Sequence, residues 1–208
     1  MASLDRRLLA VVVAGVIVVA TTLIIVFIAI VPTPEFPPLQ AGQQTGFVAY
    51  SVDGDGEAGP VRIVDLATTE VVVVDARREM ELVGWDSDGN LVVVNWATGG
   101  QFALFDPATG EEVGTMDSDD GEKLFQEGQV FINRDDGNVT LEQLDGAGTA
   151  SFTAPEAYDI GYAVSMGDDR IVFVDELGRL AVTYTGKDVA PVLVASDAVE
   201  WSRVVARP

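Results

Sequence analysis

The sequence predicts one N-terminal transmembrane α-helix followed by an all-β domain, a small four-bladed β-propeller closed by its C-terminal strand. Three observations lead to this fold class. Residues 8–31 are predominantly apolar and contain no charge and no proline. From Phe47 onward, short runs of Val, Ile, Leu, Phe and Tyr alternate with Asp-Gly, Gly-Asn and Thr-Gly turns, which is typical of antiparallel strands. A segment of similar sequence also recurs four times in this region, as propeller blades do.

The apolar run at residues 8–31 is the predicted transmembrane helix. At about 1.5 Å per residue it is long enough to cross a hydrocarbon core of about 30 Å. Arg6 and Arg7 precede it, and the first charge after it is Glu35. Positive flanks stay in the cytoplasm, so residues 1–7 are expected inside the cell and residues 47–208 outside. A cleaved signal peptide is the competing interpretation, although the apolar run is longer than a usual signal core.

Small side chains form a stripe along this predicted helix. Gly15, Thr22 and Ala29 recur at intervals of seven residues, with Ala14 and Thr21 beside them. Small residues allow close helix packing in lipid. The stripe predicts docking on another integral membrane protein, and chance occurrence in a valine-rich span is the alternative.

Residues 32–46 are the predicted stalk between the membrane and the β domain. Four prolines, at positions 32, 34, 37 and 38, lie in this stretch. Proline at this density favours an extended polyproline conformation. The β domain at residues 47–208 is therefore expected to stand off the membrane.

The internal repeat divides the β domain into four units. The aligned segments begin at Gly59, Gly100, Gly137 and Gly178, at intervals of 41, 37 and 41 residues. Each contains two strands and follows a further apolar strand; those preceding strands are residues 47–52, 91–96, 129–134 and 170–175. Residues 82–94 show one more apolar strand and a polar turn ahead of such a preceding strand, so each unit is expected to contain four short strands. Such a unit cannot bury both faces alone and must stack on its neighbours.

The two ends of the β domain are expected to share one unit. The last strand-like segment, Val199 to Ala206, has no second strand after it, and the unit that begins at Phe47 has no strand before it. Pairing the two would leave no free sheet edge at this point. Closure of the ring by the C-terminal strand is therefore predicted.

Trp85 to Gly89 carries a family resemblance. The Trp-Asp-Ser-Asp-Gly turn between two strands resembles the corresponding turn of TolB-type and Trp-Asp-repeat propellers, and the similarity extends over residues 47–208. Trp201 occupies the position equivalent to Trp85, which favours a core role for both. Trp96 follows a strand and is the tryptophan best placed to be exposed and to line a ligand site.

Composition excludes several classes of function. The chain has 33 acidic and 12 basic residues and a net charge of −21, which disfavours nucleic acid and favours basic surfaces or cations. It contains no Cys and no His. Imidazole bases, thiol nucleophiles and the usual zinc, copper or haem ligands are therefore missing. We predict that the protein is not an enzyme and has no resident cofactor.

Calcium is the one cofactor that the acidic turns suggest. Residues 53–57, 86–90 and 117–122 are rich in carboxylates, which hard cations prefer. Tight turns select the same residues for backbone reasons, so both interpretations stay open. The best metal candidates are Asp117, Asp119, Asp120 and Glu122.

The predicted function is that of a non-catalytic accessory or interaction subunit of a membrane protein complex. Ten of the 12 basic residues are Arg, and Ala, Val, Gly and Asp are abundant, a bias typical of GC-rich genomes such as those of actinobacteria. With that source, the layout resembles small accessory subunits of the actinobacterial cytochrome bcc and terminal-oxidase supercomplex. The alternative is an extracytoplasmic binding module for calcium, sugar or cell-wall material.

Overall fold

The structure is a computed structural model. It describes residues 35–208 except for 55–56, 75–79, 128–129, 136–137, 144–148, 154–159, 167, 186–188 and 200–202. Contacts between residues divide the chain into two units, Met1–Glu35 and Phe36–Pro208. The second unit carries all of the elements described below.

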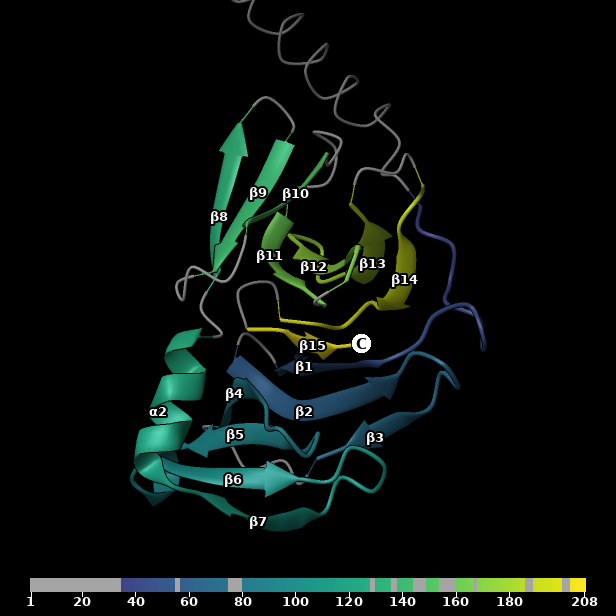
Figure 1. Cartoon of the computed structure of the whole chain (residues 1–208). Coiled ribbons are helices and arrows are strands. Elements are labelled where there is room, and N and C mark those ends of the chain that lie inside the picture. The colour runs from purple at the N-terminus through teal and green to yellow at the C-terminus, as the bar shows by residue number, and fades with distance from the viewer. Residues whose placement is uncertain are drawn as a thin grey trace, which may run out of the picture. The chain divides into compact units, whose positions relative to one another are not determined.

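Short antiparallel strands build this unit (Figure 1). The first sheet has the order β15-β1-β2-β3, with strands Val205–Arg207, Phe47–Gly54, Glu57–Asp65 and Val71–Val73. The second sheet has the order β4-β5-β6-β7, with strands Met80–Trp85, Leu91–Asn95, Gln101–Phe105 and Glu112–Met116. The 3₁₀ turn η1, Trp96–Thr98, follows β5.

The other two sheets come from the second half of the chain. One is a three-stranded sheet of order β10-β9-β8, with strands Thr149–Thr153, Asn138–Gln143 and Val130–Asp135. The last has the order β11-β12-β13-β14, with strands Ile160–Ser165, Arg170–Asp175, Leu180–Tyr184 and Val192–Ala195. The helix α2, Ser118–Glu127, lies between β7 and β8 in sequence.

Alternation along the strands places apolar side chains in separate cores. In β1, Val48 and Tyr50 belong to a core shared with β11, β12 and β13, whereas Ala49 belongs to a core shared with β4, β5 and β6. Successive residues of a strand point to opposite faces, so the first sheet is buried on both faces at β1 and β2. The second sheet repeats this pattern, because Val92 and Val94 face away from the core that contains Val93 and pack towards α2.

The predicted pairing of the C-terminal strand with the first strand of the domain is confirmed. In the register of β1 and β15, Phe47 is opposite Arg207 and Ala49 is opposite Val205. The regular strand is shorter than the predicted segment 199–206, although Ala198 forms a further bridge with Val52. Both ends of the domain therefore contribute to one sheet.

The predicted fold class, a transmembrane helix with a four-bladed propeller, is wrong. The described residues form three separate four-stranded antiparallel sheets, a sheet of three strands and one α-helix. The membrane and single-pass predictions need the same correction, since no helix among the described residues is long and apolar enough to cross a membrane. The run at residues 8–31, on which the membrane predictions depended, lies outside the described residues.

The helix α2 explains why the third repeat unit departs from the prediction. The sequence suggested an acidic turn at residues 117–122, whereas residues 118–127 are helical. Asp117 accepts a hydrogen bond from the backbone N–H of Asp119 (2.9 Å), which is the chemistry of a helix N-cap. Leu124 and Phe125 then pack against the second sheet. This segment therefore does not supply a fourth strand to the sheet of β8, β9 and β10.

Part of the predicted stalk belongs to the β unit. Phe36 is only 7% exposed and its ring meets the ring of Phe173 edge-on, at 5.8 Å between centroids. Leu39 donates a backbone hydrogen bond to Leu193 O (2.8 Å), and Leu193 donates one to Pro37 O (2.8 Å). The extended conformation that proline favours therefore lets residues 37–39 run along the outer strand β14.

Candidate binding clefts

Several predicted site residues lie outside the part of the chain that can be described. These are the proposed helix-docking residues Ala14, Gly15, Thr21, Thr22 and Ala29, together with Trp201. Their docking and core roles stay predictions. Trp85, by contrast, packs against the core between the first two sheets, as expected.

The calcium candidates line the start of α2. Asp117 caps the helix, and Asp119 and Asp120 lie in its first turn. All of these carboxylates and that of Glu122 are exposed. Among the described residues, no group of three or more His, Cys, Asp or Glu is placed to hold a metal ion. Carboxylates near a helix N-terminus also stabilise the helix dipole, so their presence here has a structural reason.

The acidic turn at residues 86–90 has the geometry of a tight turn. Both carboxylate oxygens of Asp86 are used by Asn90: Oδ1 accepts its backbone N–H (2.7 Å), and Oδ2 accepts its side-chain amide (2.9 Å). Gly89 has a φ of 88°, which glycine adopts without strain. The turn interpretation of this acidic motif is therefore favoured by its hydrogen bonds.

The first cleft lies between the β5–β6 connection and α2, and we call it the Trp96 cleft. Its volume is about 310 Å³, and it is lined by Val94, Trp96, Gly99, Gly100, Phe102, Ser118, Glu122, Phe125 and Gln126. Trp96 is 56% exposed. Its indole N–H donates to Glu81 Oε2 (3.1 Å). The predicted exposure of Trp96 is confirmed, and its ring is held in one orientation.

A positively charged side chain lies behind this cleft. The guanidinium of Arg203 lies 4.7 Å from the centre of the Phe125 ring, and its Nη2 donates to Phe125 O (3.1 Å). Its Nε and Nη1 are buried, and the side chain of Tyr162 is its neighbour. Burial lowers the pKa of Arg203, an effect that the neighbouring Tyr162 and Glu81 oppose, and burial also raises the pKa of Tyr162. The C-terminal end of α2 is thereby fixed to the segment before β15.

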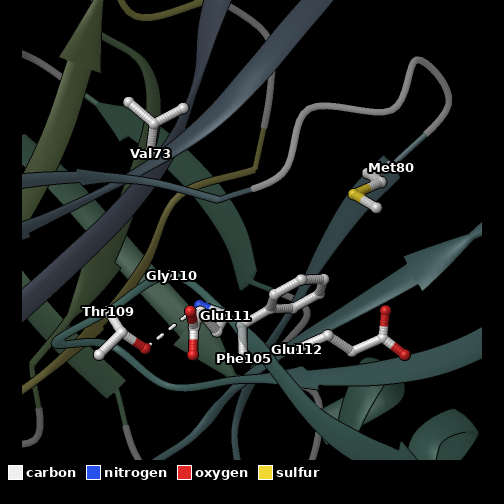
Figure 2. A pocket seen from close by; sticks show the side chains of 7 residues that line it. All are labelled: Val73, Met80, Phe105, Thr109, Gly110, Glu111 and Glu112. Atoms are coloured by element: carbon white, nitrogen blue, oxygen red, sulfur yellow. Dashed lines mark hydrogen bonds between the residues drawn. The ribbon is translucent and has the colours of Figure 1, made fainter.

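The second cleft lies where β3 meets the β6–β7 turn, and we call it the Glu111 pocket. It has a volume of about 390 Å³. Its lining residues are Val73, Met80, Phe105, Thr109, Gly110, Glu111 and Glu112. Figure 2 shows the side chains of Glu111 and Glu112 extending in different directions, with the Phe105 ring between them in this view. The pocket therefore combines an apolar floor with two carboxylates.

Glycine sets the width of this pocket. Gly110 has a φ of 72°, and a Cβ there would lie 2.7 Å from Val72 Cγ1 and 2.7 Å from Val73 O. The β6–β7 turn can therefore approach β3 only without a side chain at this position. No sequence signal distinguished Glu111 and Glu112 among the 33 acidic residues of the chain, because the floor of their pocket comes from three other strands.

The chemistry of both clefts is suited to binding. Their linings offer hydroxyl, carboxylate, amide and apolar groups, and neither contains imidazole or thiol, since the chain has no His and no Cys. The Thr109 hydroxyl accepts a hydrogen bond from the backbone N–H of Glu111 (3.3 Å), which orders the turn. These groups can hold a ligand through stacking, hydrogen bonds and charge.

Comparison with known proteins places the chain in no family: no protein-family model matches it, and no curated protein sequence is similar to it. Sequence comparison therefore supports neither the resemblance to TolB-type proteins nor the resemblance to accessory subunits of the bcc supercomplex. The resemblance to those accessory subunits stays a prediction.

Proposed function

We propose that residues 36–208 are a non-catalytic interaction domain that binds a basic segment of a partner protein. The observation that carries this proposal is the Glu111 pocket. Val73, Met80 and Phe105 give it apolar walls, and Glu111 and Glu112 give it two carboxylates. Lysine and arginine have the matching form, because an apolar stem carries a charged head.

Exposed valines beside the pocket extend the proposed contact surface. Val71 and Val73 of β3 are 52% and 55% exposed, and Val113 of β7 is 55% exposed. Both strands are outermost in their sheets. Outer strands offer backbone groups and alternate side chains to an extended partner segment. An extended segment with apolar and basic residues would use both features.

The charge of the whole chain supports a basic partner. A net charge of −21 attracts cationic surfaces at long range and raises the rate of encounter. It also disfavours self-association. The proposal retains the role of accessory subunit in a larger complex. It also includes a location outside the cytoplasm and a respiratory partner, and these two points rest on the sequence alone.

The test is native co-purification of the tagged full-length protein, with quantitative mass spectrometry of stoichiometric partners. We expect the wild-type protein to recover a partner. In the double variant Glu111→Gln, Glu112→Gln, the amount of partner recovered should fall at least about tenfold, and a tenfold change in affinity corresponds to about 1.4 kcal/mol of binding free energy. Added salt should weaken the wild-type complex.

The matched control removes the same two charges from another exposed site. Asp119→Asn with Asp120→Asn changes the start of α2, and neither residue lines the Glu111 pocket or the Trp96 cleft. This control should retain the partner. Recovery of the wild-type protein alone, or equal loss of the partner in both double variants, would count against the proposal.

A further inference from the structure

We propose that the Trp96 cleft is a binding site for a neutral sugar ring, which stacks on the indole of Trp96. This inference goes beyond the interaction with a basic protein segment and does not rest on it, since the two clefts share no lining residue. It is carried by three features of the cleft: an exposed and oriented indole, a row of polar side chains along α2, and an apolar floor.

The indole of Trp96 is exposed but fixed in position. Its N–H is used by Glu81 Oε2 at 3.1 Å, so the ring does not need a ligand to satisfy its polar atom. On one side, a Cβ at Gly100 would lie 3.3 Å from Trp96 Cζ3, so the backbone supports the ring there. A rigid aromatic face with negative potential attracts the C–H groups of a sugar ring.

Polar side chains line the opposite wall of the cleft. Ser118, Glu122 and Gln126 are spaced by four residues along α2, and this spacing puts all three on the same face of the helix. They offer a hydroxyl, a carboxylate and an amide, which together supply both donors and acceptors. Sugar hydroxyls are also both donors and acceptors, so this row matches the edge of a sugar ring.

The floor and the size of the cleft fit one small ligand. Val94 and Phe102 are 1% and 6% exposed and lie at the bottom, with Phe125 beside them. A volume of about 310 Å³ is at the lower end of the range for small-molecule sites, about 300–1,000 Å³. Arg203 holds Phe125 from the side of the β15 segment, so the wall formed by α2 is preorganised.

Charge selects a neutral ligand over an ionic one. Glu122 lines the cleft and Glu81 accepts a hydrogen bond from Trp96, so phosphates and acidic sugars meet two carboxylates. The guanidinium of Arg203 lies behind Phe125, where it contacts the ring and the carbonyl oxygen of that residue. A quaternary ammonium group prefers a cage of several aromatic faces. Here Phe125 already carries the guanidinium of Arg203 on its ring, which leaves Trp96 as the one exposed aromatic face among the residues that line this cleft.

The experiment titrates the full-length protein with three named probes by calorimetry and tryptophan fluorescence. The probes are chitotetraose and maltotetraose as neutral sugars and choline as a cation. We expect one of the neutral sugars to bind with a dissociation constant below about 1 mM. Trp96→Ala should weaken that binding at least about tenfold, and Trp96→Phe should restore part of it because a ring is retained.

Two further variants separate stacking from misfolding. Gln126→Ala should weaken sugar binding several-fold without changing the melting temperature. Leu177→Ala, which removes a side chain that is 63% exposed and does not line the cleft, should leave binding unchanged. The proposal is overturned when neither sugar binds up to about 10 mM, when Trp96→Ala binds as the wild type does, or when choline binds more tightly than both sugars.

Discussion

Single turn residues repeat their chemistry along this chain. Asp65 is the last residue of β2, and Asp106 directly follows β6. The side chain of each accepts a hydrogen bond from the backbone amide two residues later, at 2.8 and 2.7 Å. Each also accepts a backbone bond from the fourth residue on, Thr69 or Gly110, at 2.8 Å in both turns. That fourth position needs a positive φ, which is 66° at Thr69 and 72° at Gly110. The two repeat units therefore share the geometry of this turn, but only the second has glycine, the residue suited to positive φ, at the fourth position.

Thr69→Gly is expected to stabilise the protein by about 1 kcal/mol. A β-branched residue at positive φ is strained by roughly 1–3 kcal/mol, and the greater freedom of glycine in the unfolded chain offsets part of the gain. Urea unfolding followed by circular dichroism measures the difference. Gly110→Ala is the opposite change, since its Cβ would lie 2.7 Å from Val73 O, and it should destabilise. A lower midpoint for Thr69→Gly would contradict this account of the turn.

At the scale of elements, α2 depends on its contact with β6. The helix lies beside β4 and β6 in Figure 1. Gly121 is its one buried residue, and a Cβ at that position would overlap the ring of Phe102. Glycine lowers helix propensity by about 1 kcal/mol relative to alanine. Its presence inside the helix is therefore explained by the close approach of the helix to the sheet, which also sets the width of the Trp96 cleft.

Gly121→Ala is expected to destabilise the protein by about 1–3 kcal/mol although alanine favours helices, because the added methyl group must displace Phe102 or move the helix. Gly114→Ala is the matched control. It also adds one methyl group, but its Cβ would meet only Leu104 Cδ1 at 3.9 Å, so the control should stay within about 0.5 kcal/mol of the wild type. Equal unfolding midpoints for the two variants would argue against the packing explanation.

At the scale of the whole β unit, the last residues of the chain join two cores. Val204 is fully buried in the core between the first and last sheets, and Val205 is 5% exposed in the core between the first two sheets. The strand β15 pairs with β1 and also contacts β4 and β11. Residues at the two ends of the domain, such as Phe47 and Arg207, therefore depend on each other for their burial.

Val204→Ala is expected to lower the free energy of unfolding by about 1–3 kcal/mol, because it leaves a cavity at a site that joins distant strands. Val189→Ala is the control with the same chemical change, at a side chain that is 48% exposed. It should change stability by less than about 0.5 kcal/mol. Guanidinium unfolding of both variants measures the difference. Equal losses of unfolding free energy in the two variants would contradict the proposed contribution of the buried Val204 side chain to stability.

The candidate clefts were only partly predictable. Exposure of Trp96 follows from its place directly after a strand, and the sequence indicated it. Its partners in the cleft, such as Gln126, lie on a helix that the apolar pattern did not predict, because Asp117 and Gly121 were interpreted as turn residues. Glu111 and Glu112 likewise become part of a pocket only when Met80 and Phe105 form its floor.

Sequence alone determined where many of the strands of the β unit lie. The expected strands at residues 47–52, 91–96 and 170–175 correspond to β1, β5 and β12, because apolar runs between turn residues are a local property of the chain. Only tertiary structure decided that residues 118–127 form a helix and that the strands form separate sheets in place of the expected fold. Helix packing, sheet stacking and the surfaces left uncovered all depend on contacts between residues far apart in sequence, and periodicity within one segment carries no information about them.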